Sequence, residues 1–174
     1  MFKKVLLGML VVMAVGSSLF ANVTATTLSE TQKASLLFMY QEEKVARDVY
    51  ITLGKKYPSA TTFADIQLSE QQHIDAVEGL CKKYNVDISN VQESVVGVFV
   101  LPELQSLYTI LVAQGSVSLL EGLKVGVAIE EKDIVDIVAA EAGMPADVVK
   151  VFENLRAGSY SHLDAFNKAV AALQ

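Results

Sequence analysis

Cysteine, proline and basic residues are scarce in this sequence, and each scarcity excludes a class of protein. Cys81 is the only cysteine, so no disulfide can form within the chain. Only 3 of 174 residues are proline and 52% are hydrophobic, which is typical of one globular domain and not of a disordered chain. The 14 Lys and Arg residues are outnumbered by 20 Asp and Glu, so nucleic acid is a poor candidate partner. The fold must therefore be held by its apolar core, by a metal, or by both.

The first 25 residues have the layout of a secretory signal peptide. Residues 2–21, FKKVLLGMLVVMAVGSSLFA, begin with two lysines, continue with a short apolar run and end in small residues. Cleavage is predicted after Ala21 or after Ala25, which leaves a domain at residues 26–174 in the periplasm or outside the cell. An uncleaved membrane anchor is the alternative, although the apolar run is short for a span of about 20 residues.

Helical periodicity accounts for most of the sequence after this leader. Helices are predicted at residues 29–57, 62–85, 102–115, from Ser116 or Ser118 to 142, and 145–173. Thr61 or Thr62 is expected to cap the second helix, and Gly158 is expected to kink or split the last one. Residues 86–101 have no helical period and are predicted to form a crossing connection. The sequence thus predicts an all-α four-helix bundle with a long crossover connection and an extra short helix.

One predicted helix carries charged residues where apolar ones are expected. In LSEQQHIDAVEGL, residues 68–80, Glu70 and His73 fall on the same helical face as Phe63, Ile66, Val77 and Leu80. A buried hydrogen-bonded pair without a metal would explain this stretch taken alone.

A repeat places similar residues in the second half of the chain. The first half has EEKVARDVY at 42–50 and HIDAV at 73–77, and the second has EEKDIVDIV at 130–138 and HLDAF at 162–166. Glu43 precedes His73 by 30 residues, and Glu131 precedes His162 by 31. Glu130 fits the apolar face of its helix as well as Glu131 does, so both stay candidates.

Carboxylates and imidazoles from both halves are therefore expected to meet inside the bundle. A buried carboxylate is costly unless it is neutralised or finds a partner. A pair of divalent metal ions would satisfy the group, because carboxylates can bridge the ions while neutral imidazoles complete their coordination. Tyr50 is expected to be a core aromatic residue whose hydroxyl group bonds one of these carboxylates.

Two of these stretches resemble known metalloproteins. The pattern that starts at Glu43, E-K-V-A-R-D-V-Y, is similar to the first-helix E-x-x-A-R-x-x-Y pattern of rubrerythrins, and SEQQH supplies the E-x-x-H of a second helix. From about residue 32 to about residue 172, the chain resembles a bacterial and archaeal ferritin-like family known as domain of unknown function 2202. The resemblance implies a ferritin-like bundle that holds two iron ions, with manganese or zinc as alternatives.

The resemblance also implies a role for each candidate ligand. Glu43 would bind from the first helix, Glu70 would bridge the ions, and His73 would cap one of them. His162 would cap the second ion. The third long helix would contribute Glu131 or its neighbour Glu130.

The fourth long helix departs from the family pattern. Ser159 stands three residues before His162, where a glutamate is expected. Glu153 could replace that glutamate only if the chain turns at Gly158.

These features lead to two hypotheses about function. The first is an exported di-iron protein with oxidase, peroxidase or ferroxidase activity, whose substrates would be oxygen, peroxide or ferrous ion. Because one cysteine cannot build the cysteine-rich iron site of rubrerythrins, electrons would come from an external donor. A homodimer is a further expectation. The second hypothesis is a non-catalytic helical binding or stress module, in which the metal is structural or absent.

Overall fold

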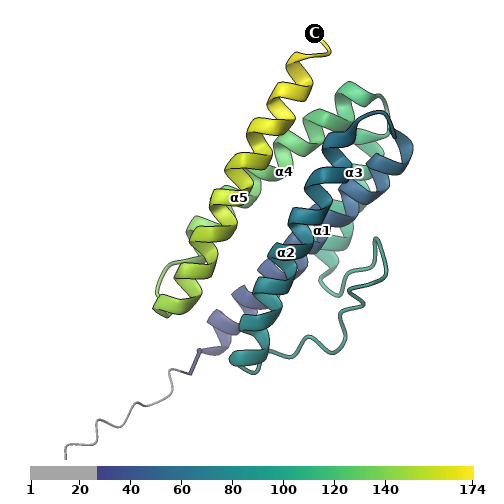
Figure 1. Ribbon diagram of the computed structural model, residues 1–174. Coiled ribbons are helices and arrows are strands. Elements are labelled where there is room, and N and C mark those ends of the chain that lie inside the picture. The colour runs from purple at the N-terminus through teal and green to yellow at the C-terminus, as the bar shows by residue number, and fades with distance from the viewer. Residues whose placement is uncertain (1–26) are drawn as a thin grey trace, which may run out of the picture.

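The computed structural model describes residues 27–174, and every regular element in this range is a helix (Figure 1). The predicted leader and both of its cleavage sites lie outside the described residues. Among the described helices, none combines the length and the apolar character needed to cross a membrane.

The helices form two pairs that pack together as a bundle. Helix α1 packs against α2, and α4 packs against α5, while the short α3 lies against both α1 and α4. The connection between α2 and α3, residues 84–101, crosses from one pair to the other. The predicted all-helical bundle, with a long connection and an extra short helix, is confirmed. The bounds are Glu30–Lys56 for α1, Thr61–Lys83 for α2, Pro102–Gly115 for α3, Leu119–Ala140 for α4 and Ala146–Ala171 for α5.

Side-chain caps fix the start of two of the long helices. Ser29 accepts a hydrogen bond from the backbone of Gln32, whose side chain accepts one from the backbone of Ser29, which is a complete capping box. Ser118 caps α4 by accepting from the backbone N–H of Glu121 at 3.1 Å. The predicted threonine cap of α2 is wrong, because both threonines lie inside the helix and Ala60 occupies the cap position.

Helix α5 runs through Gly158 without a break, so the predicted kink or split is wrong. The glycine has a different purpose, since a Cβ atom at this position would lie 2.5 Å from Nε2 of His73. Gly158 therefore allows the imidazole of His73, on α2, to lie directly against the backbone of α5.

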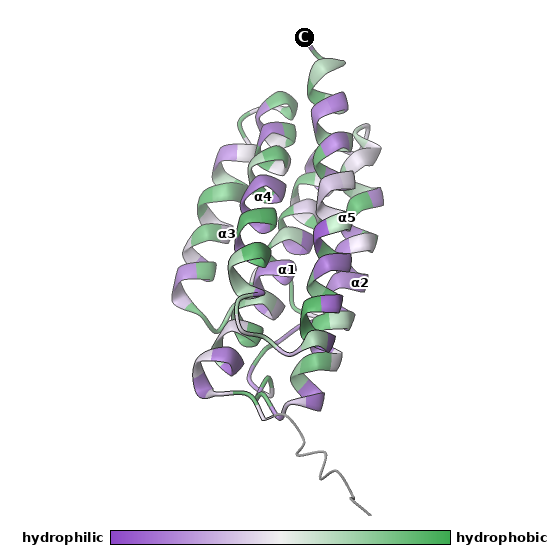
Figure 2. Cartoon of the chain, turned by 90° about the vertical axis from the view of Figure 1, so that its left-hand side faces the viewer, coloured by the Kyte–Doolittle hydropathy of each residue, from purple (hydrophilic) through white to green (hydrophobic). Residues whose placement is uncertain are grey.

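The bundle interior is divided into two apolar clusters. Each helix carries alternating bands of hydrophobic and hydrophilic residues (Figure 2), and the hydrophobic faces meet inside. Leu36, Ile74, Ile137 and Phe152 belong to one cluster. Leu53, Phe63, Leu123 and Phe166 belong to the other. Between these clusters, every long helix contributes buried polar side chains, namely Glu43 from α1, Glu70 and His73 from α2, Glu130 and Asp133 from α4, and Ser159 and His162 from α5.

A second polar group ties the connection to α1. It consists of the buried Lys44, Arg47 and Asp48 and the half-buried Glu93, and we call these four residues the connection anchor. Lys44 Nζ lies 2.5 Å from Asp48 Oδ2 and donates to the carbonyl oxygens of Val95 and Val98. Arg47 pairs with Asp48 and with Glu93, both at 2.8 Å. These bonds hold a segment without regular structure across the bundle.

Candidate metal centre

Five buried residues form two groups that can each hold a metal ion. Glu43, Glu70 and His73 make the first group, and Glu70, Glu130 and His162 make the second. In each group, one potential ligand atom from every residue lies within 4.8 Å of the others. Glu70 belongs to both groups, so the two groups are adjacent.

The two carboxylate oxygens of Glu70 face different histidines. Oε2 lies 3.0 Å from His73 Nδ1, and Oε1 lies 2.9 Å from His162 Nδ1. Each of these imidazole nitrogens also lies near a further carboxylate, that of Glu43 at 3.2 Å from His73 and that of Glu130 at 3.4 Å from His162. The arrangement is that of one central carboxylate between two sites, each completed by one histidine and one glutamate.

Two neighbouring hydroxyl groups orient the second site. The Tyr50 hydroxyl donates to Glu130 Oε1 at 2.5 Å, so the predicted bond from Tyr50 to a carboxylate of the site is confirmed. Ser69 Oγ lies 2.8 Å from His162 Nε2, which leaves Nδ1 turned toward the carboxylates. Hydrogen bonds of this kind fix the orientation of metal ligands and tune their basicity.

Burial and mutual contact shift the pKa of every group in the centre. Burial raises the pKa of Glu43 and of Glu130 to about 8. Burial alone would lower the pKa of the histidines, but their contacts with the carboxylates outweigh it and raise the pKa of His73 to about 11 and of His162 to about 9. Burial would raise the pKa of Glu70, yet its two imidazole neighbours lower it to about 2. Positive charge is therefore strongly favoured next to Glu70.

Several polar atoms of the centre have no hydrogen-bond partner among residues 27–174. They are Glu43 Oε1, Glu70 Oε1, Asp133 Oδ1 and His162 Nδ1. The pair formed by Glu70 Oε1 and His162 Nδ1 is close but is not aligned as a hydrogen bond. Buried polar atoms without partners are costly and rare. Since oxygen and imidazole nitrogen donors suit iron, manganese or zinc, these residues fit a pair of such ions.

The structure brings together four of the five residues first chosen from the sequence and replaces the fifth. Glu43, Glu70, His73 and His162 meet, whereas Glu131 is exposed and Glu130 takes the place expected for it. The register of α4 explains this correction, because Glu130 shares its face with the buried Ile137, while Glu131 lies one step round the helix.

The alternative ligand Glu153 lies outside the centre. It is exposed and lies 3.6 Å from Lys150 on the surface of α5. Because α5 does not turn at Gly158, Glu153 stays on the side of the helix away from His162.

Asp133 is the buried carboxylate that sequence reasoning missed. Only 5% of its surface is exposed, and its Oδ2 accepts a hydrogen bond from Ser159 Oγ at 2.6 Å. A signal was available, since Asp133 follows Glu130 by one helical turn and Ser159 stands where a glutamate is expected.

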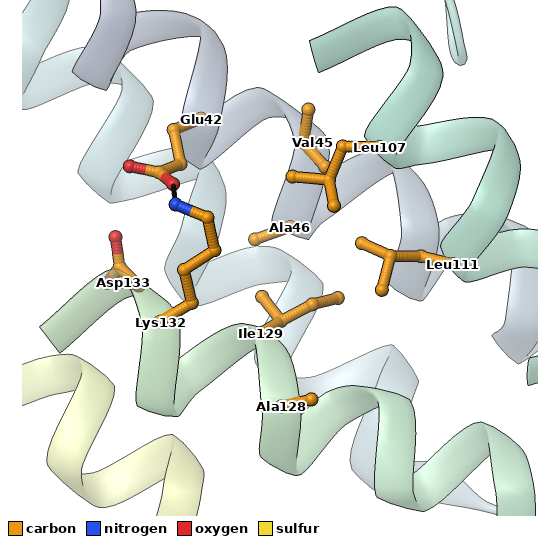
Figure 3. Close-up of a pocket in the computed structure, with 9 residues that line it drawn as sticks. All are labelled: Glu42, Val45, Ala46, Leu107, Leu111, Ala128, Ile129, Lys132 and Asp133. Atoms are coloured by element: carbon orange, nitrogen blue, oxygen red, sulfur yellow. Dashed lines mark hydrogen bonds and ion pairs between the residues drawn. The ribbon is translucent and has the colours of Figure 1, made fainter. Parts of the chain in front are cut away.

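A small cavity of about 40 Å³ lies beside the centre, between α1, α3 and α4 (Figure 3). Glu42, Lys132 and Asp133 lie at one end of it, and Lys132 Nζ is 2.9 Å from Glu42 Oε1. Asp133 therefore borders both the cavity and the group of buried carboxylates. The remaining walls are apolar and consist of Val45, Ala46, Leu107, Leu111, Ala128 and Ile129.

Comparison with known proteins places the chain in a family. A family model described as "Uncharacterized protein domain (DUF2202)" matches residues 32–173. The "Uncharacterized protein MJ0754" of Methanocaldococcus jannaschii is 42% identical over 140 residues, which cover 80% of this chain and 75% of that protein. The crystal structure of hypothetical protein MJ0754 superposes with a TM-score of 0.81 at 40% identity, covering 85% of this chain and 84% of the other. The chain therefore belongs to the DUF2202 family.

Proposed function

We propose that this protein is a di-iron carboxylate protein that reacts with oxygen or peroxide, or that oxidises ferrous ion. The observation that carries the proposal is the position of Glu70, whose two oxygens face two histidines within 3.0 Å in a dry part of the bundle. Neither a structural salt bridge nor a hydrogen-bonded pair requires one carboxylate to be shared by two such groups.

Each ion would have its own ligands in addition to the shared carboxylate. Glu43 and His73 would hold one ion, and Glu130 and His162 would hold the other. A glutamate from each of two helices, together with Glu-x-x-His motifs from the others, is the ligand pattern of ferritin-like di-iron bundles. This chain has one such motif, at residues 70–73, and a Ser-x-x-His sequence at residues 159–162.

The remaining residues of the site would control its access and geometry. The two apolar clusters exclude water on both sides of the carboxylates, and Tyr50 holds Glu130 in place. The small cavity next to Asp133 suits a substrate of very few atoms. Bound iron would supply the electron transfer needed to reduce oxygen or peroxide. External electrons would be needed, since Cys81 is the only cysteine and is buried.

Export of the protein is part of the same proposal. The leader-like residues 1–25 support a location in the periplasm or outside the cell. In that compartment, the electron donor would be a separate protein or a small molecule.

Metal stoichiometry provides the decisive experiment. The protein is treated with a chelator, titrated with Fe(II) without oxygen, and analysed for bound iron and for consumption of oxygen or peroxide. We expect about two ions per chain in the wild type and loss of both in Glu70→Gln, because this residue belongs to both groups. His73→Ala should lose the ion at the first group, and the exposed Glu131→Gln serves as the matched control.

A wild-type protein that binds no iron, and melts at the same temperature with and without Fe(II), would overturn the proposal. That result would favour a helical binding module whose buried carboxylates stay protonated.

A further inference from the structure

We propose that Asp133 is a sixth metal ligand, which α4 supplies in place of the carboxylate that α5 lacks at Ser159. This inference rests on the proposed di-metal function and adds a ligand to it. It concerns the site formed by Glu43, Glu70 and His73, which Asp133 adjoins.

The two halves of the bundle, α1–α2 and α4–α5, carry a carboxylate on different helices at equivalent positions. Aligned on the buried glutamates of the centre, α1 reads Glu43-x-x-Ala46 and α4 reads Glu130-x-x-Asp133. Aligned on the histidines, α2 reads Glu70-x-x-His73 and α5 reads Ser159-x-x-His162. One half therefore combines an alanine with a glutamate, and the other combines an aspartate with a serine. Each half has one carboxylate in this pair of positions, but on a different helix.

Hydrogen bonding leaves one oxygen of Asp133 available. Ser159 Oγ donates to Asp133 Oδ2 at 2.6 Å, which fixes the orientation of the carboxylate. Oδ1 has no hydrogen-bond partner in the described part of the chain, although Asp133 is 95% buried. A carboxylate with only a structural purpose would be expected to have both oxygens satisfied.

The charges around Asp133 show which group it adjoins. Burial raises the pKa of Asp133, the charges of Glu43 and Glu70 raise it further, and His73 lowers it. Gly158, next to Ser159, lies against the ring of His73. Asp133 is thus buried near the first group of ligands through Ser159 and Gly158. It is not one of the three residues whose ligand atoms lie within 4.8 Å of one another, so binding would require its side chain to move closer.

Charge balance gives a further reason to include Asp133. Three carboxylates and two neutral imidazoles leave a pair of divalent ions with an excess of one positive charge. Adding Asp133 makes four carboxylates and brings the net charge of the buried centre to zero. A neutral group is the least costly arrangement in a dry interior.

The test compares Asp133→Asn with the wild type in a titration with Co(II), followed by calorimetry and by the visible spectrum of the bound ion. Asparagine has the same size and can still accept a hydrogen bond from Ser159, but it removes the charge. We expect the wild type to bind two ions, and Asp133→Asn to bind one of them more than about 100-fold more weakly, since loss of an outer partner alone costs about 10- to 100-fold. The exposed Glu131→Gln, on the same helix, should bind as the wild type does.

Moving the carboxylate to α5 provides a second measurement. Asp133→Ala combined with Ser159→Glu should regain most of the lost affinity, whereas Asp133→Ala alone should not. Without metal, Asp133→Asn should melt at the same or a higher temperature than the wild type, because the amide can keep the hydrogen bond from Ser159 and cannot become charged. A purely structural Asp133 would give the opposite change in melting temperature.

The outcomes separate the two proposals. If the wild type and Asp133→Asn bind two ions with equal affinity and equal spectra, the sixth ligand is refuted and the di-metal function stands. If the wild type binds no Co(II), Fe(II) or Mn(II), the proposed function fails and this inference fails with it. If the double variant folds but binds no better than Asp133→Ala, the equivalence of the two positions is refuted.

Discussion

Two buried groups of charged residues begin at adjacent positions of α1, Glu43 and Lys44, and they are balanced in different ways. The connection anchor joins two cations, Lys44 and Arg47, to two carboxylates, Asp48 and Glu93. The candidate metal centre gathers the carboxylates of Glu43, Glu70 and Glu130 around two imidazoles, with Asp133 nearby, and it includes buried atoms without partners among the described residues.

The difference teaches how to recognise a site among buried charges. Lys44 is fully buried, but its ammonium group has a carboxylate, two carbonyl oxygens and the ring of Phe99, 4.4 Å away, as partners. The anchor is complete without any further atom, and its purpose is to hold residues 84–101 in place. In the candidate metal centre, by contrast, buried oxygen and nitrogen atoms are left without hydrogen-bond partners among the described residues. Buried polar atoms without partners, and not burial alone, therefore indicate a ligand.

The largest expected effect is a loss of stability of the metal-free protein as the pH rises. The folded-state pKa of Glu43 and Glu130 is about 8 instead of 4.5. Their contribution to the free energy of unfolding is therefore complete below about pH 4.5 and is lost as the pH approaches 8. The pKa values of His73 and His162 are about 11 and 9 instead of 6.5, so their contribution is lost between pH 6.5 and those values. All four groups act in the same direction.

Melting curves between pH 5 and pH 9 test this prediction. The metal-free protein should melt at steadily lower temperatures as the pH rises. The increase in melting temperature on addition of Mn(II) should grow over the same range, because the metal then competes with fewer protons. The lowered pKa of Glu70, about 2, affects stability only in acid, where protonation below pH 4.5 removes its contribution. A melting temperature that rises from pH 5 to pH 9 without metal would contradict the pKa shifts.

The next effect is expected at the connection anchor. Lys44→Met should lower the free energy of unfolding by about 3–5 kcal/mol, because it leaves the buried Asp48 without its ammonium partner and two partly buried carbonyl groups without a donor. Urea unfolding with and without metal would measure it, and the loss should be the same in both conditions. Lys33→Met, at a surface pair with Glu30, should cost less than about 1 kcal/mol. A loss that disappears on addition of metal would mean that the two groups are not independent.

A smaller effect is expected from the hydroxyl group that supports the second site. Tyr50→Phe removes the hydrogen bond to Glu130 and keeps the ring packing with Phe166. It should lower the affinity for one of the two metal ions by about 10- to 100-fold. Calorimetric titration with Co(II) would measure this change. Tyr57→Phe, which removes a hydroxyl bond to the Gly115 carbonyl away from the centre, is the matched control. Equal losses in both variants would rule out a specific supporting role for Tyr50.

The smallest effect is expected at the position first chosen from the repeat. Glu131→Gln should change both metal affinity and unfolding free energy very little, by less than about 0.5 kcal/mol, because the side chain is exposed. Glu130→Gln, one residue earlier, should strongly lower the affinity for the ion held by the second group. If Glu131→Gln were the more damaging of the two, the register of α4 described above would be incorrect.

Local patterns were enough to predict the helices and most of the centre. Ser29 begins one helix as expected, and Ser118, one of two serines expected at that place, begins another. Glu70 and His73 were identified because a charged pair on an apolar helical face is unusual. Repetition of the motif then identified His162 and Glu43. These predictions succeeded because helical periodicity fixes which side chains share a face, whatever the helix packs against.

Other features depended on how the helices meet. Glu130 and Glu131 fit the apolar period of their helix equally well, and only the packing of α4 against its neighbours decided between them. Gly158, expected to break a helix, instead admits the ring of His73. Asp133 could be identified only from the structure, because its hydrogen-bond partner Ser159 lies on another helix. The sequence by itself determined the helices and the residues with metal-binding chemistry, since both depend on local spacing. The tertiary structure decided which of those residues share one dry interior, because that depends on the rotation and approach of separate helices.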